Sequence, residues 1–325
     1  MSLHPAIAAV RGAVRRSLAD LAPGATVVVA CSGGADSMAL LSATVFEGRD
    51  ASLQVVGVTV DHGLQEGSAE HADRVAATMR ALGVAESLTV RVDVEAPGMG
   101  PEAAAREARY AVLSQVAERW SAAAVLLGHT QDDQAETVLL GLTRGSGARA
   151  LSGMRRSFEV YRRPLLDVTR ADTETACLAE GIDFWRDPHN TDERFTRVRV
   201  RTKVMPVLEA ELGPGVSAAL ARTADQLRAD TEYLDAVSER ALAGAESRDG
   251  LAVSVLEELP DAVRTRVLRL AAVRAGSPPA ELFHSHVREV DRLVTAWHGQ
   301  KWVDLPGHLR AVRRDGVLRL EPASG

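Results

Sequence analysis

The first residues able to do chemistry form a short loop of small side chains between an apolar run and a helical stretch. The β-branched run at 26–31 leads into Ser32-Gly-Gly-Ala-Asp-Ser37, and the helical pattern Met38-Ala-Leu-Leu-Ser-Ala follows. Without bulk at Ser32 and the two glycines, backbone N–H groups can close on an anion, and the helix N-terminus adds partial positive charge. The residues predicted to hold a nucleotide phosphate are Ser32, Gly33, Gly34, Ala35, Asp36 and Ser37.

This loop differs from the two common nucleotide-binding loops. It has neither the Gly-Lys-Ser/Thr of a P-loop nor the three-glycine dinucleotide fingerprint. Asp36 and Ser37 fall at the helix entrance, where a helix cap or a contact to Mg²⁺ is the natural role, and we predict Asp36 as the metal ligand. A glycine turn that serves only the strand-to-helix geometry is the alternative.

A second group of residues combines acidic side chains with a histidine. Gly128-His-Thr-Gln-Asp-Asp-Gln-Ala-Glu-Thr follows a predicted strand and opens a predicted helix. On a helix Asp132 and Asp133 lie four and three residues before Glu136, so the three acids gather near the first turn beside His129. They can be mere partners of the helix dipole, but triphosphate chemistry also needs Mg²⁺, which prefers oxygen ligands. We therefore predict all four as catalytic residues.

Two further pairs of residues are candidates for nucleotide contacts. Asp61 and His62 end the second predicted strand, where an acidic residue often meets a ribose or base, although a strand-end Asp also caps loops. Arg106 and Arg109 are three apart on one helical face and can reach a phosphate together. A solvated helical face is the alternative for these two arginines.

The elements that must position these residues alternate as a parallel sheet requires. Strand patterns fall at 26–31, 54–61, 87–94 and 123–128, and helical patterns between them at 37–46, 68–82 and 101–120. A parallel sheet binds its ligand at the carboxyl ends of its strands. The phosphate loop, Asp61 and His129 all follow strands, so we expect them to line one crevice.

The pattern changes to long helices beyond Gly213-Pro214-Gly215. Helical stretches at 216–244, 259–275 and 284–298 precede a strand at 301–305 and a run at 309–320 with a tight turn at Asp315-Gly316. We expect a catalytic domain at 1–212 and a smaller, mainly helical domain at 216–325 that ends in a hairpin. This domain carries no chemical motif.

Composition excludes several classes of protein. The chain has 325 residues, of which 46% are hydrophobic, and a net charge of −6, which argues against a protein that coats nucleic acid indiscriminately. RNA affinity must then come from local patches, for which Arg313 and Arg314 near the end are candidates. The two cysteines, Cys31 and Cys177, form no disulfide framework and no CxxC pair. No apolar run approaches a membrane span and no signal peptide is evident, so a cytoplasmic protein is expected.

Seven motifs in order make the chemistry specific. They are Cys-Ser-Gly-Gly-Ala-Asp-Ser at 31–37, Val-Asp-His-Gly-Leu at 60–64, Ala-Arg-Glu-Ala-Arg-Tyr at 105–110, Gly-His-Thr-Gln-Asp-Asp-Gln-Ala-Glu-Thr at 128–137, Arg-Gly-Ser-Gly at 144–147 with Leu-Ser-Gly-Met at 151–154, Arg-Pro-Leu-Leu at 163–166, and Asp-Pro-His-Asn from 187 with the Arg-rich stretch after it. The chain from residue 31 to about 208 thereby resembles the tRNA(Ile)-lysidine synthetase family, a member of the N-type ATP pyrophosphatases of the PP-loop superfamily.

The resemblance implies a reaction, a fold and partners. The family attaches lysine to carbon 2 of the wobble cytidine in an isoleucine tRNA with a CAU anticodon, through an adenylated cytidine, and releases AMP and pyrophosphate. The fold implied is an α/β sheet of the adenine-nucleotide α-hydrolase-like type. ATP and Mg²⁺ are the expected cofactors, L-lysine and the tRNA the expected partners, with no membrane, and a homodimer is left open.

The resemblance also implies where the substrates bind. Residues expected near the target base, the lysine or the tRNA are Arg144, Gly145, Ser146, Gly147, Arg163, Asn190, Arg197 and Arg201. The chain departs from the family pattern at Thr130, where a second histidine is frequent, and at Val198, where asparagine is frequent. His129, Asp133 and Glu136 remain open as the base that deprotonates lysine, and Arg106 and Arg109 are expected to offset phosphate charge.

Three other functions share some of these features. A tRNA thiolase has the same loop and adenylation step, but it is expected to carry paired cysteines. An amidating ligase acting on a small substrate gives no reason for the arginines at 194–201 or for the helical appendage. A catalytically silent RNA-binding scaffold is the third, and the intact carboxylates argue against it.

Overall fold

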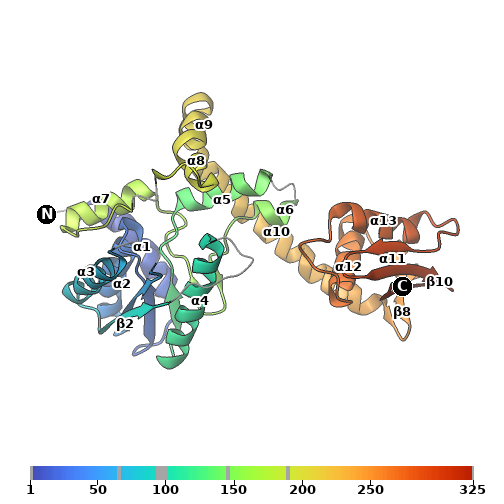
Figure 1. Ribbon diagram of the computed structural model, residues 1–325, viewed down its shortest axis with the longest axis horizontal. Coiled ribbons are helices and arrows are strands. Elements are labelled where there is room, and N and C mark those ends of the chain that lie inside the picture. The colour runs from blue at the N-terminus through green and yellow to red at the C-terminus, as the bar shows by residue number, and fades with distance from the viewer. Residues whose placement is uncertain (1–2, 64–66, 93–100, 144–146, 188–190, 324–325) are drawn as a thin grey trace. The chain divides into compact units, whose positions relative to one another are not determined.

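The chain forms two compact units in a computed structural model that describes residues 3–63, 67–92, 101–143, 147–187 and 191–323. The first unit consists of Met1–Thr143 and Gly153–Ala224, and the second of Arg144–Ser152 and Asp225–Gly325 (Figure 1). We expected a boundary at 213–215, whereas the chain passes from one unit to the other inside a continuous helix. The Arg144–Ser152 segment, expected in the catalytic domain, groups with the second unit.

A six-stranded sheet forms the centre of the first unit. Its order is β3-β2-β1-β4-β6-β5, and every neighbouring pair is parallel except β5 and β6. The strands are β1 (Thr26–Ala30), β2 (Gln54–Asp61), β3 (Glu86–Arg91), β4 (Ala124–Leu126), β5 (Ser157–Phe158) and β6 (Tyr161–Arg162). The predicted α/β class and its first four strands are confirmed.

Both faces of this sheet are buried because its central strands are continuously apolar. In β1, Val27 and Val29 face one hydrophobic cluster and Val28 faces another, as the two-residue period of a strand requires. The first cluster holds residues of α1 (Pro5–Leu18), α2 (Ala35–Asp50), α3 (Ser68–Leu82) and α7 (Arg170–Glu180), and the second holds residues of α4 (Pro101–Arg119). The carboxyl ends of the strands are thereby fixed between two helical layers.

The remaining helices of the first unit include those that carry Arg197 and Arg201 of the predicted site. They are α5 (Gln131–Thr143), α8 (Thr196–Arg199), the π-helical turn η2 (Val200–Val204), α9 (Met205–Leu212) and the start of α10 (Val216–Ala245). Ala135 of α5, Val200 and Met205 form a small buried cluster that joins these helices. None of the described helices is long and apolar enough to cross a membrane.

The second unit contains more β-structure than its sequence predicts. An antiparallel sheet of order β7-β8-β11-β10-β9 packs against helices through one hydrophobic cluster. The elements are α6 (Ala148–Leu151), β7 (Glu246–Ser247), β8 (Gly250–Ala252), α11 (Val253–Glu258), α12 (Asp261–Arg274), α13 (His284–Thr295), β9 (Val303–Leu305), β10 (Leu309–Arg314) and β11 (Val317–Pro322). The hairpin turn at Asp315-Gly316 is confirmed, because β10 and β11 pair across it and both turn residues have positive φ.

Candidate active site

The phosphate loop follows β1 and opens α2, as the sequence predicts. Gly34 is the N-cap of α2 and Gly33 has a φ of +84°. The Ser37 hydroxyl accepts a hydrogen bond from the Ser32 N–H at 3.2 Å and donates to the Gly34 carbonyl at 2.9 Å. The first N–H groups of a helix have no partner within the helix, so this turn presents them to an anion.

Two residues that sequence reasoning missed hold the loop from outside. The His71 Nε2 lies 3.0 Å from the Ser32 carbonyl, and the Trp185 N–H donates to the Gly33 carbonyl at 2.8 Å. The two rings contact each other with centroids 4.0 Å apart. Because both carbonyls are engaged by donors, the loop is fixed with its oxygens bound to protein groups. No motif contains His71 or Trp185, so only the structure reveals them.

Gly33→Ala is expected to raise the ATP dissociation constant at least 10-fold. A Cβ at this position would lie 2.6 Å from Val75 Cγ2 and 2.8 Å from His71 Cε1, so the loop must move. Gly24→Ala is the control, because Gly24 has a similar φ of +82° and open space around its Cβ position. Equal ATP affinities in these two variants, measured by calorimetry, would show that the close packing of the loop does not matter for nucleotide binding.

The end of β4 packs directly onto the first turn of α2. A Cβ on Gly128 would lie 3.1 Å from the Ser37 N and 3.2 Å from the Asp36 carbonyl carbon, so only glycine permits this approach. The contact brings the segment that follows β4, with its histidine and acids, to the phosphate loop. The predicted convergence of these two strand ends is therefore present in the structure.

Three arginines surround the acids of α5. The Arg197 Nε donates to Glu136 Oε2 at 2.8 Å, and the Arg201 Nε donates to Glu136 Oε1 at 2.7 Å. The Arg170 Nη2 donates to Asp133 Oδ1 at 3.0 Å, and its Nε lies 3.5 Å from Asp36 Oδ2. Arg170 thus links the acid of the phosphate loop to the acids of α5, and it carries no signal in the sequence.

The acids differ in how they are held. Glu136 is only 1% exposed and Asp133 is 7% exposed. The buried negative charge of each carboxylate is therefore stabilised by the arginines that contact it. Asp132 accepts a hydrogen bond from the Arg170 N–H at 2.8 Å, which places it at the start of α7. Thr130 donates its N–H and its hydroxyl to Asp133 Oδ2 at 2.9 and 3.1 Å. This departure from the family pattern therefore fixes an acid of the cluster.

Burial and neighbouring charges shift the pKa values of the two linked aspartates in opposite directions. Burial raises the pKa of Asp36 to about 6, although Arg170 and the Thr173 hydroxyl favour its charged form. Burial also opposes the charge of Asp133, but Arg170 and Arg197 outweigh it and lower the pKa of this carboxyl. Asp36 is thus the group that gains most from an added cation.

His129 is held as a neutral imidazole. Burial, together with Arg163 and Arg197, lowers its pKa to about 3 despite the nearby Asp133. Its Nδ1 accepts a hydrogen bond from the Arg163 Nε at 3.3 Å, which leaves the proton on Nε2. Arg163 also donates to the Tyr110 hydroxyl at 3.1 Å. The free face of His129 therefore offers a hydrogen-bond donor.

The other predicted nucleotide contacts lie at the end of β2 and on α4. The pKa of Asp61 is lowered overall. Burial opposes this shift, but hydrogen bonds from the Gly63 N–H, 2.9 Å from Oδ1, and from the Ser68 hydroxyl outweigh the effect of burial. Burial and Arg109 lower the pKa of His62. The charge of Arg109 also helps to lower the pKa of His129. Arg106 donates to the Tyr110 hydroxyl at 3.4 Å.

The other residues expected at the tRNA fall either outside the described residues or in the second unit. Arg144, Gly145, Ser146 and Asn190 fall outside the described residues. Gly147 has a φ of +78° and is the N-cap of α6 in the second unit. Arg313 Nη1 donates to the carbonyls of Leu293 and Val294 at 2.9 Å each, at the C-terminal end of α13. Arg314 is exposed beside the hairpin turn.

The two neighbouring arginines of the hairpin are expected to give different phenotypes. Arg313→Ala should lower stability by about 1 kcal/mol, because the last carbonyls of α13 lose their cation. Arg314→Ala should leave stability unchanged and flatten the salt dependence of tRNA binding by about one counterion. Thermal unfolding and tRNA binding at several salt concentrations separate the two. An Arg314→Ala variant with unchanged tRNA affinity and slope would remove this residue from the interface.

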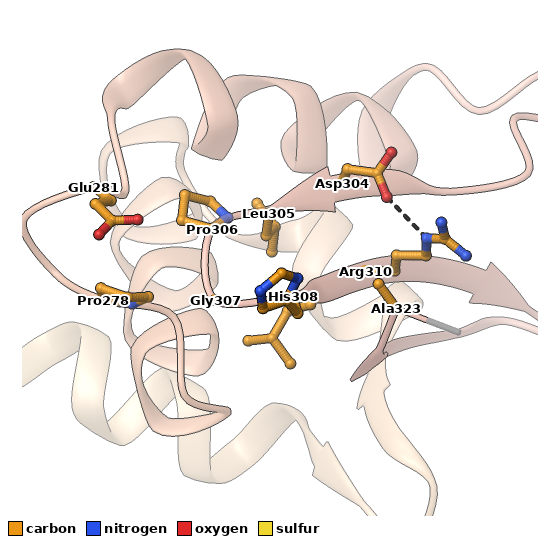
Figure 2. Close-up of a pocket in the computed structure, with 10 residues that line it drawn as sticks. Pro278, Glu281, Asp304, Leu305, Pro306, Gly307, His308, Arg310 and Ala323 are labelled. Atoms are coloured by element: carbon orange, nitrogen blue, oxygen red, sulfur yellow. Dashed lines mark hydrogen bonds and ion pairs between the residues drawn. The ribbon is translucent and has the colours of Figure 1, made fainter. Parts of the chain in front are cut away.

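A hollow of about 680 Å³ is lined by residues from the last fifty positions of the chain. It is lined by Pro278, Glu281, Ala323 and the segment 304–310, all of the second unit, and by none of the predicted site residues. Figure 2 shows the ion pair of Asp304 and Arg310, 2.8 Å apart, on one side and Pro278 with Glu281 on the other. The hollow contains no group of metal ligands, and no cluster of three or more His, Cys, Asp or Glu that could hold a metal occurs anywhere among the described residues.

Comparisons with known proteins agree with this geometry. A PP-loop domain model matches residues 10–208, and a TilS substrate binding domain model matches residues 251–319. The chain is 54% identical to a tRNA(Ile)-lysidine synthase of Thermobifida fusca over 97% of both chains, and 49% identical to one of Streptomyces coelicolor over 98% of this chain and 99% of that one.

One solved structure shares the fold. A U34-tRNA thiolase of Methanococcus maripaludis covers 68% of this chain and 79% of its own, with a TM-score of 0.59 and 18% identity. At that identity the likeness extends to the fold alone. The matches over nearly the full length decide the family: the chain belongs to the tRNA(Ile)-lysidine synthases, a family of ligases.

Proposed function

We propose that this chain ligates L-lysine to carbon 2 of the wobble cytidine in the CAU-anticodon isoleucine tRNA, with ATP converted to AMP and pyrophosphate. The observation that carries the proposal is the presence of both a PP-loop domain and a TilS substrate binding domain in a chain that matches named lysidine synthases end to end. We assign the proposed reaction to the cytoplasm, because the relatives' substrate is a tRNA.

The phosphate loop is proposed to hold the pyrophosphate part of ATP. The turn at Gly33 and Gly34 supplies backbone N–H groups, and Asp61 is assigned to the adenosine. Adenylation of the cytidine oxygen makes carbon 2 electrophilic, and the lysine ε-amine then displaces AMP. Arg106 and Arg109 of α4 are assigned to the phosphate charge that develops in the first step.

Asp36 fits the role of the Mg²⁺ ligand. Mg²⁺ in nucleotide sites is usually held by one or two carboxylates together with the phosphates, so a single protein carboxylate suffices. Burial disfavours the charge on Asp36, and a cation beside it would restore that charge. When bound, Mg²⁺ would neutralise charge on the phosphates.

Asp133 and Glu136 are proposed to position arginines rather than to remove a proton. Both carboxylates are occupied by Arg170, Arg197 and Arg201 at distances of 2.7 to 3.4 Å. His129 presents a donor and has a pKa of about 3, which makes it a poor base. The lysine proton is therefore assigned to solvent water before attack, because desolvation of the amine beside Arg170, Arg197 and Arg201 would lower its pKa.

Sulfur transfer is not favoured by the two cysteines. Cys31 and Cys177 are both buried, and burial raises the pKa of each thiol to about 12. A thiolate needed for sulfur chemistry would be scarce at neutral pH.

Measurement of ATP products tests the proposal. Pyrophosphate and AMP should appear in equal amounts and only when the CAU-anticodon tRNA is present. Release of ADP, or product formation with ammonia or a sulfur donor in place of lysine, would contradict it. A tRNA whose wobble cytidine is replaced by uridine serves as the matched control and should support no pyrophosphate release.

A further inference from the structure

A cluster of three arginines in the second unit stays positively charged despite its own carboxylate. We call it the Arg149 cluster: Arg149 of α6, Arg266 and Arg269 of α12, and Asp235 of α10 (Figure 1). Arg149 Nη2 lies 2.6 Å from Asp235 Oδ2, and Arg266 Nε lies 3.8 Å from Asp235 Oδ1. Two guanidinium groups thus share one carboxylate, and with Arg269 the cluster has three positive charges and one negative charge.

Arg269 gives the cluster its unbalanced charge. It donates to the carbonyl oxygens of Pro279, at 2.9 Å, and of Leu282, and it forms no salt bridge with a described carboxylate. Burial and the charge of Arg149 both disfavour its protonated form and lower its pKa. The neutral carbonyls hold the guanidinium in place without neutralising it. Like charges kept together in this way destabilise a fold unless an anion joins them.

The other arginines of α12 are balanced by acids. Arg274 contacts both Glu239 and Glu246, the latter at 3.4 Å. Arg264 contacts Asp291 at 2.6 Å and Asp261 at 3.3 Å. Excess positive charge on this helix is therefore confined to Arg266, which shares Asp235 with Arg149, and to Arg269. The side chain of Arg149 is 70% exposed.

We infer that Arg149, Arg266 and Arg269 bind phosphodiester groups of the tRNA, which compete with Asp235 for the first two. The inference rests on the proposed function, which supplies the tRNA. Guanidinium groups match phosphate oxygens in planar, two-point contacts. Arg149 stands two residues beyond Gly147, the last residue of a motif expected near the target base, and α12 lies within the residues matched by the substrate binding domain model. The cluster thus joins two tRNA-related segments within one unit.

Binding of the CAU-anticodon tRNA to the full chain at a series of salt concentrations tests this inference. Arg149→Ala, Arg266→Ala and Arg269→Ala should each weaken binding about 3- to 10-fold and reduce the slope of log K against log salt by about one. Arg274→Ala is the matched control on the same helix and should change affinity less than twofold. Arg149→Ala is the safest variant for folding, because this side chain is mostly exposed.

Asp235→Asn separates a phosphate site from a structural ion-pair network. Removal of the competing carboxylate should strengthen tRNA binding or steepen its salt slope, whereas a purely structural role predicts lower thermal stability and weaker binding. Unchanged affinity and slope in the double variant R149A/R266A, or weaker binding in Asp235→Asn, would overturn the inference.

Two further readouts keep this test separate from the proposed function. The dissociation constant for ATP should stay unchanged in all variants, and a rise in it without a change in tRNA binding would assign the cluster to ATP phosphates and overturn the inference. Lysine incorporation at tRNA concentrations below saturation should fall in step with the loss of tRNA affinity. If the parent chain itself incorporates no lysine, the proposed function fails, while the salt slopes still report on the phosphate contacts.

Discussion

Asp36→Ala is expected to reduce tRNA-dependent pyrophosphate release by roughly 10³-fold or more, because the nucleotide site loses its proposed Mg²⁺ ligand. The fold should persist, since Arg170 keeps its contact with Asp133 at 3.0 Å when Asp36 is removed. The affinity for tRNA should change less than twofold, because the variant removes a negative charge and no RNA contact. The measurement is pyrophosphate release at saturating tRNA and lysine.

The control for this prediction lies on the same helix. Asp50 ends α2 in an exposed position, so Asp50→Ala removes one acid from the helix without touching the crevice. If Asp36→Ala and Asp50→Ala turned over at similar rates, Asp36 would not be a Mg²⁺ ligand and would serve only at the start of the helix. Asp36→Asn should behave as Asp36→Ala does, because an amide oxygen binds Mg²⁺ far more weakly than a carboxylate.

Glu136→Gln is expected to lower the rate of lysine transfer at least about 10²-fold. The amide keeps the shape of the side chain, but it cannot accept hydrogen bonds from Arg197 and Arg201 with both of its polar atoms. One of the two guanidinium groups then loses its acceptor, and both lose the negative charge beside them. Glu136→Ala removes the buried partner completely and should also cost about 3 to 5 kcal/mol of stability.

The pH dependence of the Glu136→Gln defect separates a positioning residue from a base. The neutral fraction of the lysine ε-amine rises about 10-fold per pH unit below its pKa near 10.4, so high pH replaces a missing base. If Glu136 positions arginines, the ratio of parent to variant rates stays constant from pH 7 to 9. A ratio that falls toward one over this range would instead identify Glu136 as the base and contradict the proposed role.

The sequence predicts the phosphate loop and its sheet well for a physical reason. The run of valines in β1 and β2 can be buried only in a two-faced sheet, and a glycine turn before a helix has few other uses. Short strands lack such a signal. β5, β6 and β7 have two residues each and β8 has three, too few to show a period. The hairpin of the first unit and two of the five strands of the second sheet were therefore not predicted.

The arginines around Asp133 and Glu136 could not be predicted from residue spacing. The grouping of Asp132, Asp133 and Glu136 follows from helical geometry, but their partners come from three other segments of the chain. Arg170 lies 37 residues from Asp133 and Arg201 65 residues from Glu136. Contacts of this kind depend on tertiary packing, which no local pattern encodes. Carboxylates predicted as metal ligands or bases therefore acquire, in the structure, the surroundings of anchored ion pairs.

The most direct test of the central claim follows lysine itself. The full chain is incubated with labelled lysine, ATP and the CAU-anticodon isoleucine tRNA, and the tRNA is then digested to nucleosides. The account predicts label in a single modified nucleoside whose mass equals cytidine plus lysine less one water, formed only with ATP and absent when the tRNA carries another wobble base. Label released with the free nucleotides, or no labelled nucleoside at all, would contradict it.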